Sequence, residues 1–155
     1  MKGSETVIAA LNGLLAYELA AIDQYFIHSE MYADWGLSKL YDRIAHEAED
    51  EKGHAKKLIE RILMLEGRPD MVTRDGLNIG THVPSMLQSD LDVEVAVGNA
   101  LKAAIQLCES ENDYVTRDIL VVLLDDTEVD HAYWLEKQLG LIGLLGLENY
   151  LQSQL

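Results

Sequence analysis

The chain has 155 residues, 48% of them hydrophobic, so a single domain over residues 1–155 with a buried core is expected. Its 27 acidic and 12 basic residues give a formal net charge of −15, which disfavours nucleic acid or an anionic membrane as a partner and favours cations. The single cysteine, Cys108, leaves no intrachain disulfide and fits a reducing compartment.

The first two predicted elements are long amphipathic helices. In residues 5–34, apolar residues recur with the 3.6-residue helical period, and Glu18 interrupts their stripe. In residues 37–66 the stripe is continued by Glu51 and His54. The start of the chain has no segment of the signal-peptide kind, and no apolar run approaches the roughly 20 residues of a membrane span. We therefore expect a cytoplasmic protein without a membrane partner.

Residues 67–82 are rich in glycine and show no helical period. Extended, such a linker spans on the order of 50 Å, whereas a helix of about 28 residues is roughly 42 Å long. The linker can therefore run the length of a helical bundle and leave its flanking helices parallel. Together with the helices, it predicts an all-α four-helix bundle with a long crossover between the second and third helices.

The second half of the chain predicts three further helices. Pro84 is suited to the first turn of the third helix, whose apolar stripe includes Glu94. A fourth helix is expected from Asp113 to about residue 139, with Gly140 and Gly143 breaking it. Residues 144–151 predict a short fifth helix, apolar enough to pack on another subunit.

Four carboxylates and two imidazoles lie on these apolar stripes. Two pairs share a Glu-x-x-His spacing that places both side chains on one face of a helix. One such pair alone is usually a solvated face, but four carboxylates in one core are tolerable only with compensating charge, and two divalent cations supply it. Oxygen donors with one nitrogen per metal suit iron(II) or manganese(II). The predicted di-metal ligands are Glu18, Glu51, His54, Glu94, Glu128 and His131.

Other side chains have two interpretations each. Tyr25, two turns after Glu18, is either a core aromatic residue whose hydroxyl needs a partner, or a group that hydrogen-bonds a ligand carboxylate or gives an electron to the oxidised centre. His46 and Asp50, one helical turn apart, form at least a surface pair. His28 and His82 are expected at the surface.

This ordered ligand set resembles that of the bacterioferritins. The resemblance covers essentially the whole chain and includes several flanking segments: Met1–Gly3, Asp23–Phe26, Trp35–Leu37, Ile59–Leu63, Leu77–Gly80, Ser89–Leu91, Asp113–Val115 and Gly146–Leu151. It implies a ferritin-like bundle with a short fifth helix, assembled into a hollow 24-subunit cage. Such a cage oxidises iron(II) with O2 or H2O2 at an intrasubunit di-iron centre, two irons per subunit, and stores the iron(III) mineral.

The resemblance also implies a role for each ligand. Glu18 and Glu94 would be terminal ligands, and Glu51 and Glu128 would bridge the two irons, while each histidine would bind one of them. The pair of His46 and Asp50 matches a position on the cavity face where some family members bind a further iron.

One position departs from the family. Bacterioferritins have a methionine directly after the second-helix ligand glutamate, and two such methionines hold a haem between subunits, but this chain has Lys52. We therefore expect no haem b in a homo-oligomer, unless the chain co-assembles with a haem-binding sister subunit. Gly53, a mid-helix glycine that costs up to about 1 kcal/mol relative to alanine, has no explanation from the sequence.

The favoured interpretation is an iron-storage ferroxidase. The alternative is a di-iron carboxylate oxidase or peroxidase that does not store iron, which a substrate pocket beside the metals would favour. A third class, a non-catalytic scaffold subunit, is disfavoured because all six predicted ligands are present.

Overall fold

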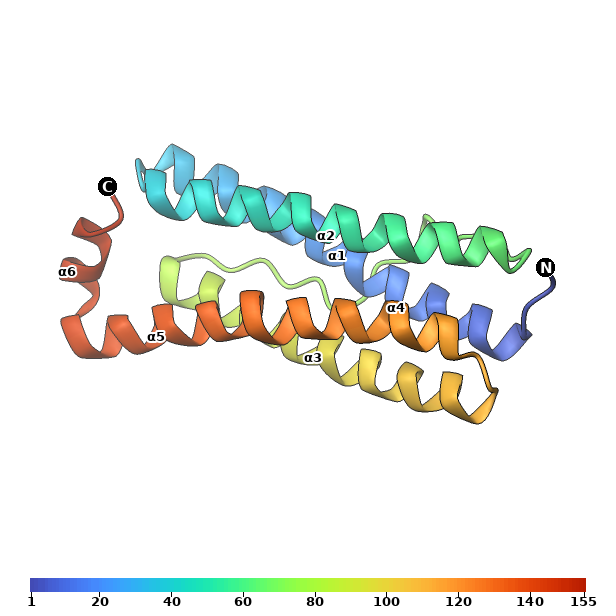
Figure 1. Cartoon of the computed structure of the whole chain (residues 1–155). Coiled ribbons are helices and arrows are strands. Elements are labelled where there is room, and N and C mark those ends of the chain that lie inside the picture. The colour runs from blue at the N-terminus through green and yellow to red at the C-terminus, as the bar shows by residue number, and fades with distance from the viewer.

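The computed structural model describes residues 1–155 and contains helices and turns but no strand. Four long helical segments form a bundle, and a short helix follows the last of them (Figure 1). In chain order the elements are α1 (Glu5–Asp34), α2 (Ser38–Met64), α3 (Val83–Ser110), α4 (Tyr114–Asp125), η1 (Asp126–Ala132), α5 (Tyr133–Leu145) and α6 (Leu147–Gln152).

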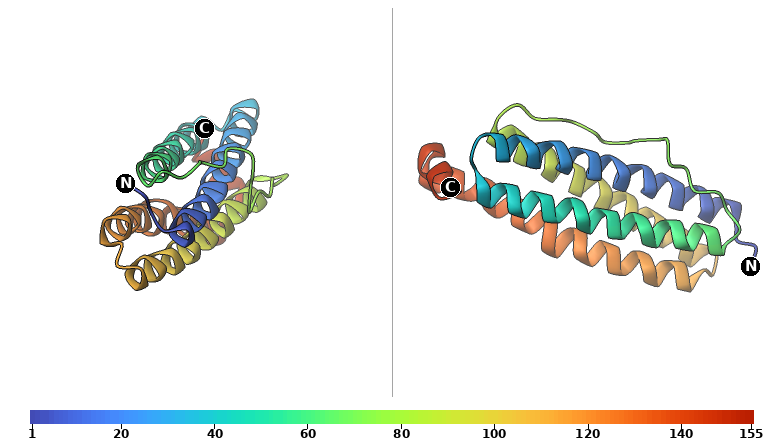
Figure 2. Two further views of the ribbon diagram at one scale, coloured as in Figure 1. Left: turned by 90° about the vertical axis from the view of Figure 1, so that its right-hand side faces the viewer. Right: turned by 90° about the horizontal axis from the view of Figure 1, so that it is seen from above.

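The topology follows from one long and two short connections. Short turns join α1 to α2 and α3 to α4, so each pair forms a hairpin (Figure 1). Residues 65–82 instead run the length of the bundle along α1 and return the chain to its other end (Figure 2). Consequently α2 and α3 run in the same direction, and the predicted all-α bundle with a crossover is confirmed.

Local signals fix the helix ends. The Ser4 hydroxyl accepts a hydrogen bond from the backbone N–H of Val7 at the start of α1, as an N-cap does. Gly36 takes a positive φ of 79° in the turn before α2, a conformation that glycine adopts without strain. Asp113 caps α4 by accepting from the N–H of Thr116, and it also pairs with the buried Arg61 of α2 at 3.1 Å. These contacts join the two hairpins at one end of the bundle.

The crossover is fastened to α1 by a buried polar network. His28 is fully buried, so its expected surface position is wrong. Its Nδ1 lies 2.8 Å from Asp90 Oδ1 on α3, and its Nε2 accepts the backbone N–H of Gly80 in the crossover at 3.0 Å. Gln24 repeats this arrangement, since it donates to Asp90 at 2.7 Å and accepts from the N–H of Asn78 at 2.8 Å. His82, in contrast, is exposed as expected and caps α3.

The fourth long segment contains a change of winding. Between α4 and α5 lies η1, a π-helical segment, in which backbone hydrogen bonds join residues five apart rather than four. The expectation that Gly140 and Gly143 end the helix is wrong, because α5 continues to Leu145 and ends at Gly146, where φ is +80°. A glycine within a helix costs about 1 kcal/mol, which weakens the helix without ending it.

The helix α6 lies across one end of the bundle (Figure 1). The buried Tyr150 hydroxyl donates to Gln138 of α5 at 2.8 Å and fixes this position. Leu144 and Leu147, beside it, are exposed in the single chain. Separately, α1 is long and apolar enough to cross a membrane by length and composition alone, but half of the relevant stretch is buried, as in the core helix of a bundle.

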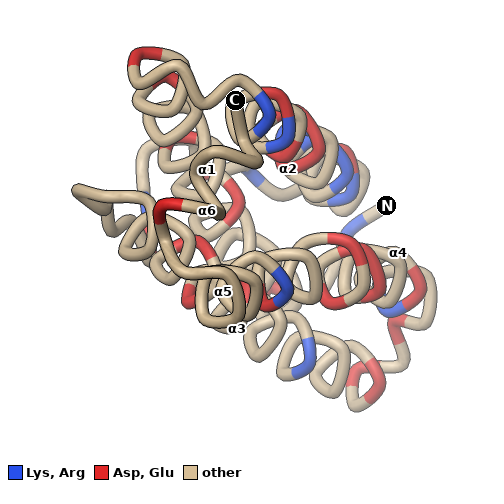
Figure 3. The backbone as a smooth tube through the Cα atoms, turned by 90° about the vertical axis from the view of Figure 1, so that its left-hand side faces the viewer, with Lys and Arg blue, Asp and Glu red and all other residues tan.

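Acidic residues occur along all four long segments, whereas basic residues are fewer and occur mainly on α2 (Figure 3). The acidic excess therefore covers the bundle rather than one patch. Five acidic residues do not belong to this surface, because they are buried: Glu18, Glu47, Glu51, Asp90 and Glu94.

The His28 network predicts a local loss of stability. Replacing His28 with Phe removes the acceptor for the Gly80 N–H, and a buried donor without a partner costs about 1–3 kcal/mol. We expect amide hydrogen exchange in residues 77–81 to accelerate in the variant. His82→Asn, which changes an exposed histidine and keeps a capping side chain, should leave it unchanged. Equal protection in His28→Phe and the wild type would contradict the role given to this network.

Candidate metal centre

Three carboxylates from three helices meet in the middle of the bundle. Glu18 comes from α1, Glu51 from α2 and Glu94 from α3, and each is at most 2% exposed. Each occupies a position in the apolar stripe of its helix, so packing of the stripes brings the three together. The second oxygens of Glu18 and Glu94 have no hydrogen-bond partner.

Two imidazoles complete the centre. His54 Nδ1 lies 3.4 Å from Glu18 and 3.3 Å from Glu51. His131 Nδ1 lies 2.7 Å from Glu51 and 3.3 Å from Glu94. The two rings are nearly parallel, with centroids 5.8 Å apart. The side chains thus form two triads that share one carboxylate, and the ligand atoms within each triad lie within 4.8 Å of one another: Glu18, Glu51 and His54, and Glu51, Glu94 and His131.

Glu128, predicted as the sixth ligand, does not join them. Its side chain is 51% exposed and pairs with Lys102 of α3 at 3.0 Å. The reason is the winding of η1. Residues three apart share a face in an α-helix, but the wider π-helical turn separates Glu128 from His131. On η1 the buried residues are Thr127 and His131 instead.

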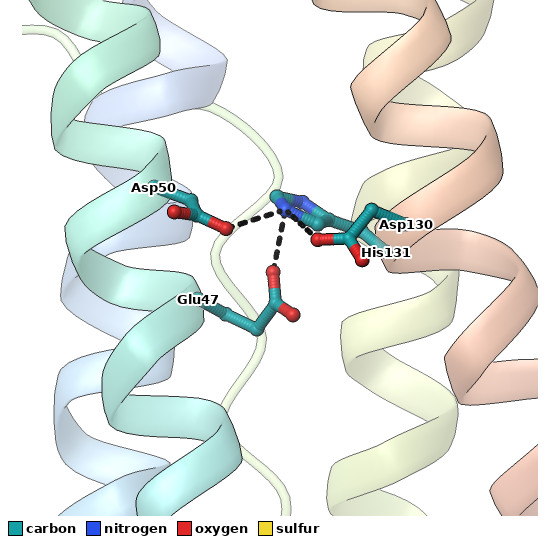
Figure 4. Close-up of side chains that lie close together, drawn as sticks. All are labelled: Glu47, Asp50, Asp130 and His131. Carbon is teal, nitrogen blue, oxygen red and sulfur yellow. Dashed lines mark hydrogen bonds and ion pairs between the residues drawn. The ribbon is translucent and has the colours of Figure 1, made fainter.

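The outer nitrogen of each imidazole faces another carboxylate. His54 Nε2 lies 2.6 Å from Asp126, and His131 Nε2 lies 2.5 Å from Glu47. Figure 4 shows Glu47, Asp50 and Asp130 converging on His131 from α2 and η1. Acceptors of this kind orient an imidazole and fix which nitrogen is free to bind a metal. Here they leave Nδ1 of both rings directed at the three core carboxylates.

Glu47 is already neutralised by a cation of the chain. Arg43 Nε lies 2.6 Å from Glu47, and the same guanidinium donates to the backbone carbonyl of Asp130 at 2.8 Å. It also stacks over the ring of Trp134, 4.6 Å from the centroid. Arg43 therefore ties α2 to η1 behind His131. Glu47 and its neighbours accordingly act as supports for the imidazole.

His46 and Asp50 are placed differently from each other. They form a pair at 3.5 Å, but the His46 side chain is 65% exposed, whereas Asp50 also turns toward His131 Nε2 at 3.4 Å. Asp50 thus belongs to the group in Figure 4, and His46 does not. A further iron at this pair stays a prediction.

Tyr25 is buried, and its hydroxyl donates a hydrogen bond to Glu94 Oε1. Both the core packing and the bond to a candidate ligand carboxylate are therefore present. Its role as an electron donor stays a prediction.

The proximity of the three carboxylates changes their protonation. Burial and the charge of Glu51 raise the pKa of Glu18, and the same two causes raise the pKa of Glu94 to about 8. Burial also opposes ionisation of Glu51, but hydrogen bonds with Glu18 and both imidazoles hold its pKa below its usual value. Without a metal, burial and the charge of Glu51 therefore favour the protonated forms of Glu18 and Glu94.

The imidazoles are cationic in the same state. Burial alone would lower the pKa of His54, but its bonds to Glu18 and Glu51 raise it to about 11. Burial likewise opposes protonation of His131, and contacts with Glu47, Glu51 and Glu94 outweigh it and raise its pKa. Protons thus supply the positive charge that this buried group of carboxylates requires.

The residues present fit a pair of divalent metal ions. The donors are three carboxylates and two imidazoles, with no thiolate, since the only cysteine lies elsewhere in the core. Such a donor set suits iron(II) or manganese(II). The carboxylate oxygens without hydrogen-bond donors are the atoms that a cation would satisfy.

Sequence reasoning missed the residues behind the imidazoles. Glu47 lies one turn before Glu51 on α2, so the helical period could have identified it. Thr127 follows the buried Leu120 and Leu123 at helical spacing and could have been identified in the same way. Asp126 could not, because nothing in the local sequence indicates the π-helical winding that brings it to His54. Arg43 reaches Asp130 across 87 positions of sequence.

Comparisons with known proteins agree with this architecture. A family model described as a ferritin-like domain matches residues 8–145. A protein of Synechocystis named bacterial ferritin is 61% identical over 155 residues, covering all of this chain and 99% of that protein. A protein of the same name from Pseudomonas aeruginosa is 59% identical over the full length of both chains. A bacterioferritin of Brucella melitensis is 38% identical over 97% of this chain and 92% of its own.

The protonation of the centre predicts that metal binding releases protons. A metal ion competes with protons on Glu94 below a pKa of about 8 and on His54 below about 11, so apparent affinity should rise between about pH 6 and about pH 8. The measurement is cobalt(II) titration of the metal-free protein in weak buffer with a pH indicator. His54→Gln should release fewer protons per ion than the wild type, and His82→Gln should release as many. An affinity independent of pH would contradict the prediction.

Proposed function

Because the chain belongs to the ferritin-like domain family, we propose that it is an iron-storage protein that oxidises iron(II) at its buried centre and keeps the iron(III) mineral inside a hollow cage. The observation that carries the proposal is the pair of triads sharing Glu51. Each triad offers one imidazole and two carboxylates to one iron, and the shared carboxylate keeps the two irons together.

The chemistry needs two irons because each gives up one electron. Together they supply the two electrons that reduce O2 to hydrogen peroxide, or hydrogen peroxide to water. The chain contributes position and charge: Glu18 and Glu94 each serve one iron, and the outer carboxylates hold the imidazoles in place. Tyr25, bonded to Glu94, is the residue placed to give a further electron.

Storage requires assembly, for which the proposed form is a 24-subunit cage in the cytoplasm. The exposed leucines beside α6 support a subunit contact at that end, because apolar side chains at such exposure are commonly covered in an assembly. The partners are iron(II) and O2 or H2O2. The chain forms the cage alone or together with a haem-binding sister subunit.

The shared carboxylate provides the test of function. Glu51→Gln removes a ligand from both irons, so the initial rate of iron(II) oxidation should fall at least about tenfold. Glu49→Gln, an exposed glutamate on the same helix, is the matched control and should retain the rate. Light scattering checks that both variants keep the particle size. A wild-type particle no larger than a dimer, with rapid iron oxidation, would favour the alternative oxidase or peroxidase that does not store iron.

At the position where bacterioferritins hold haem, this chain has no residue on α2 that can serve as the axial ligand. Lys52 and Gly53 line a groove of about 990 Å³ on the outer face of α1 and α2, together with Phe26 and Ile59. An ammonium group cannot replace a thioether as an iron ligand. The groove is also lined by a methionine, Met71, but this residue lies on the crossover rather than on α2. A side chain at Gly53 would meet nothing within 4 Å, so packing within the subunit does not require this glycine.

We therefore expect cages purified from haem-replete cells to show no Soret absorption. Lys52→Met restores a thioether at the groove and is expected to introduce a Soret band. A haem content near one per two subunits in the wild type would show that the argument from Lys52 is wrong.

A further inference from the structure

The buried face of η1 offers a hydroxyl where the bundle pattern calls for a carboxylate. Bundles of this class hold two metals with a Glu-x-x-His pair on each of two helices. On η1 the buried pair is Thr127 and His131, four residues apart. Thr127 is 1% exposed, and its Oγ1 has no hydrogen-bond partner. A buried hydroxyl without a partner is costly, which points to a ligand that would satisfy it.

The charge of the centre also leaves room for a ligand. Glu18, Glu51 and Glu94 bring three negative charges, whereas two divalent ions bring four positive ones. The fourth carboxylate, Glu128, is held by Lys102 at the surface. Counted over the two triads alone, a loaded centre would therefore carry one positive charge in excess, which one small anion bound to the metals would cancel. Asp126, beside His54 Nε2, is partly exposed and lies outside this count.

Solvent can approach the centre from this side. A pocket of about 260 Å³ reaches Glu94, and its wall includes Lys102 and Glu128. Glu94 Oε2 has no hydrogen-bond partner. The one lysine of the lining is paired with Glu128, and Glu136 lies in the lining as well, so the pocket provides a route for a small ligand rather than an attraction for anions. Its volume is below the roughly 300–1,000 Å³ of typical sites for drug-sized ligands.

We propose that Glu51 is the only carboxylate of this chain shared by the two metal ions, and that the η1 side of the centre binds a small exchangeable anion, such as azide or a short carboxylate, beside Thr127. The Thr127 hydroxyl donates a hydrogen bond to this anion. The proposal rests on the di-metal centre of the proposed function. It specifies the class of the additional ligand and the residue that selects it.

The competing arrangement has Glu128 rotating inward when metals bind. Its pair with Lys102 is exposed, and exposed pairs are worth only about 0–1 kcal/mol, so this pair alone would not prevent the movement. The experiment must therefore distinguish an anion from the outside from the carboxylate of Glu128.

Cobalt(II) provides a readout that does not depend on iron oxidation. The assembled, metal-free protein is loaded anaerobically with cobalt(II), and its visible d–d absorption is followed during titration with azide. The wild type should show a saturable spectral change. Thr127→Glu supplies a protein carboxylate at this position, so the azide response should disappear and the second cobalt ion should bind at least about tenfold more tightly. Thr127→Val, which keeps the shape and removes the hydroxyl, should weaken azide binding and retain both cobalt ions.

Glu128→Gln decides between the two arrangements. Unchanged cobalt affinity and an unchanged azide response in this variant would support the proposal. A loss of cobalt affinity of about tenfold or more would identify Glu128 as a ligand and overturn it, as would a wild-type spectrum that azide does not alter. If neither the wild type nor any variant binds two cobalt ions per subunit, the di-metal centre of the proposed function is itself wrong.

Discussion

The cost of keeping three carboxylates close together and away from water governs the middle of this bundle. Two like charges about 4 Å apart repel by about 4 kcal/mol at the effective dielectric of a protein. Glu18, Glu51 and Glu94 can share one site only if positive charge accompanies them. In the metal-free chain, burial and mutual repulsion raise the pKa of Glu18 and Glu94, which favours their neutral forms, and contacts with carboxylates raise the pKa of both imidazoles, which favours their cationic forms. Protons and metal ions are thus alternative occupants of the same site. Protons can therefore balance these carboxylates until a metal ion replaces them.

Groups outside the centre decide which atoms face it. Asp126 and Glu47 each hold the outer nitrogen of an imidazole, and Arg43 holds Glu47 in turn. These contacts join α2 to η1, so the two histidines acquire their orientation only when the hairpins pack. On the opposite side, His28 links α1 to Asp90, one helical turn before Glu94. That network fixes the register of α1 against α3 with buried hydrogen bonds at some distance from the metal ligands.

How much of the site could be predicted depended on how regular each helix is. The crossover and the pairing of helices followed from the length of the linker, and the Glu51–His54 pair followed from the period of α2, which is undisturbed. The equivalent reasoning did not anticipate the exposed position of Glu128 in the metal-free chain, because it assumed an α-helix where η1 is π-helical. It failed for Gly140 and Gly143 because glycine weakens a helix by about 1 kcal/mol and does not by itself end it. His28 looked like a surface residue because its partners lie more than 50 positions away in sequence.

The change of winding in η1 has a consequence for how the metals are held. A carboxylate built into the chain compensates charge permanently, whether or not a metal is present, and adds to the repulsion in the metal-free state. An anion from solvent compensates charge only when metals are bound, and it leaves when they leave. With Glu128 at the surface, the metal-free centre carries three carboxylates instead of four and is easier to protonate. Metal ions that are substrates must enter and depart repeatedly. Such repeated binding and release is easier at a centre with one fixed shared carboxylate, Glu51, and one exchangeable ligand beside Thr127. A centre with a complete set of protein ligands would hold its ions more permanently.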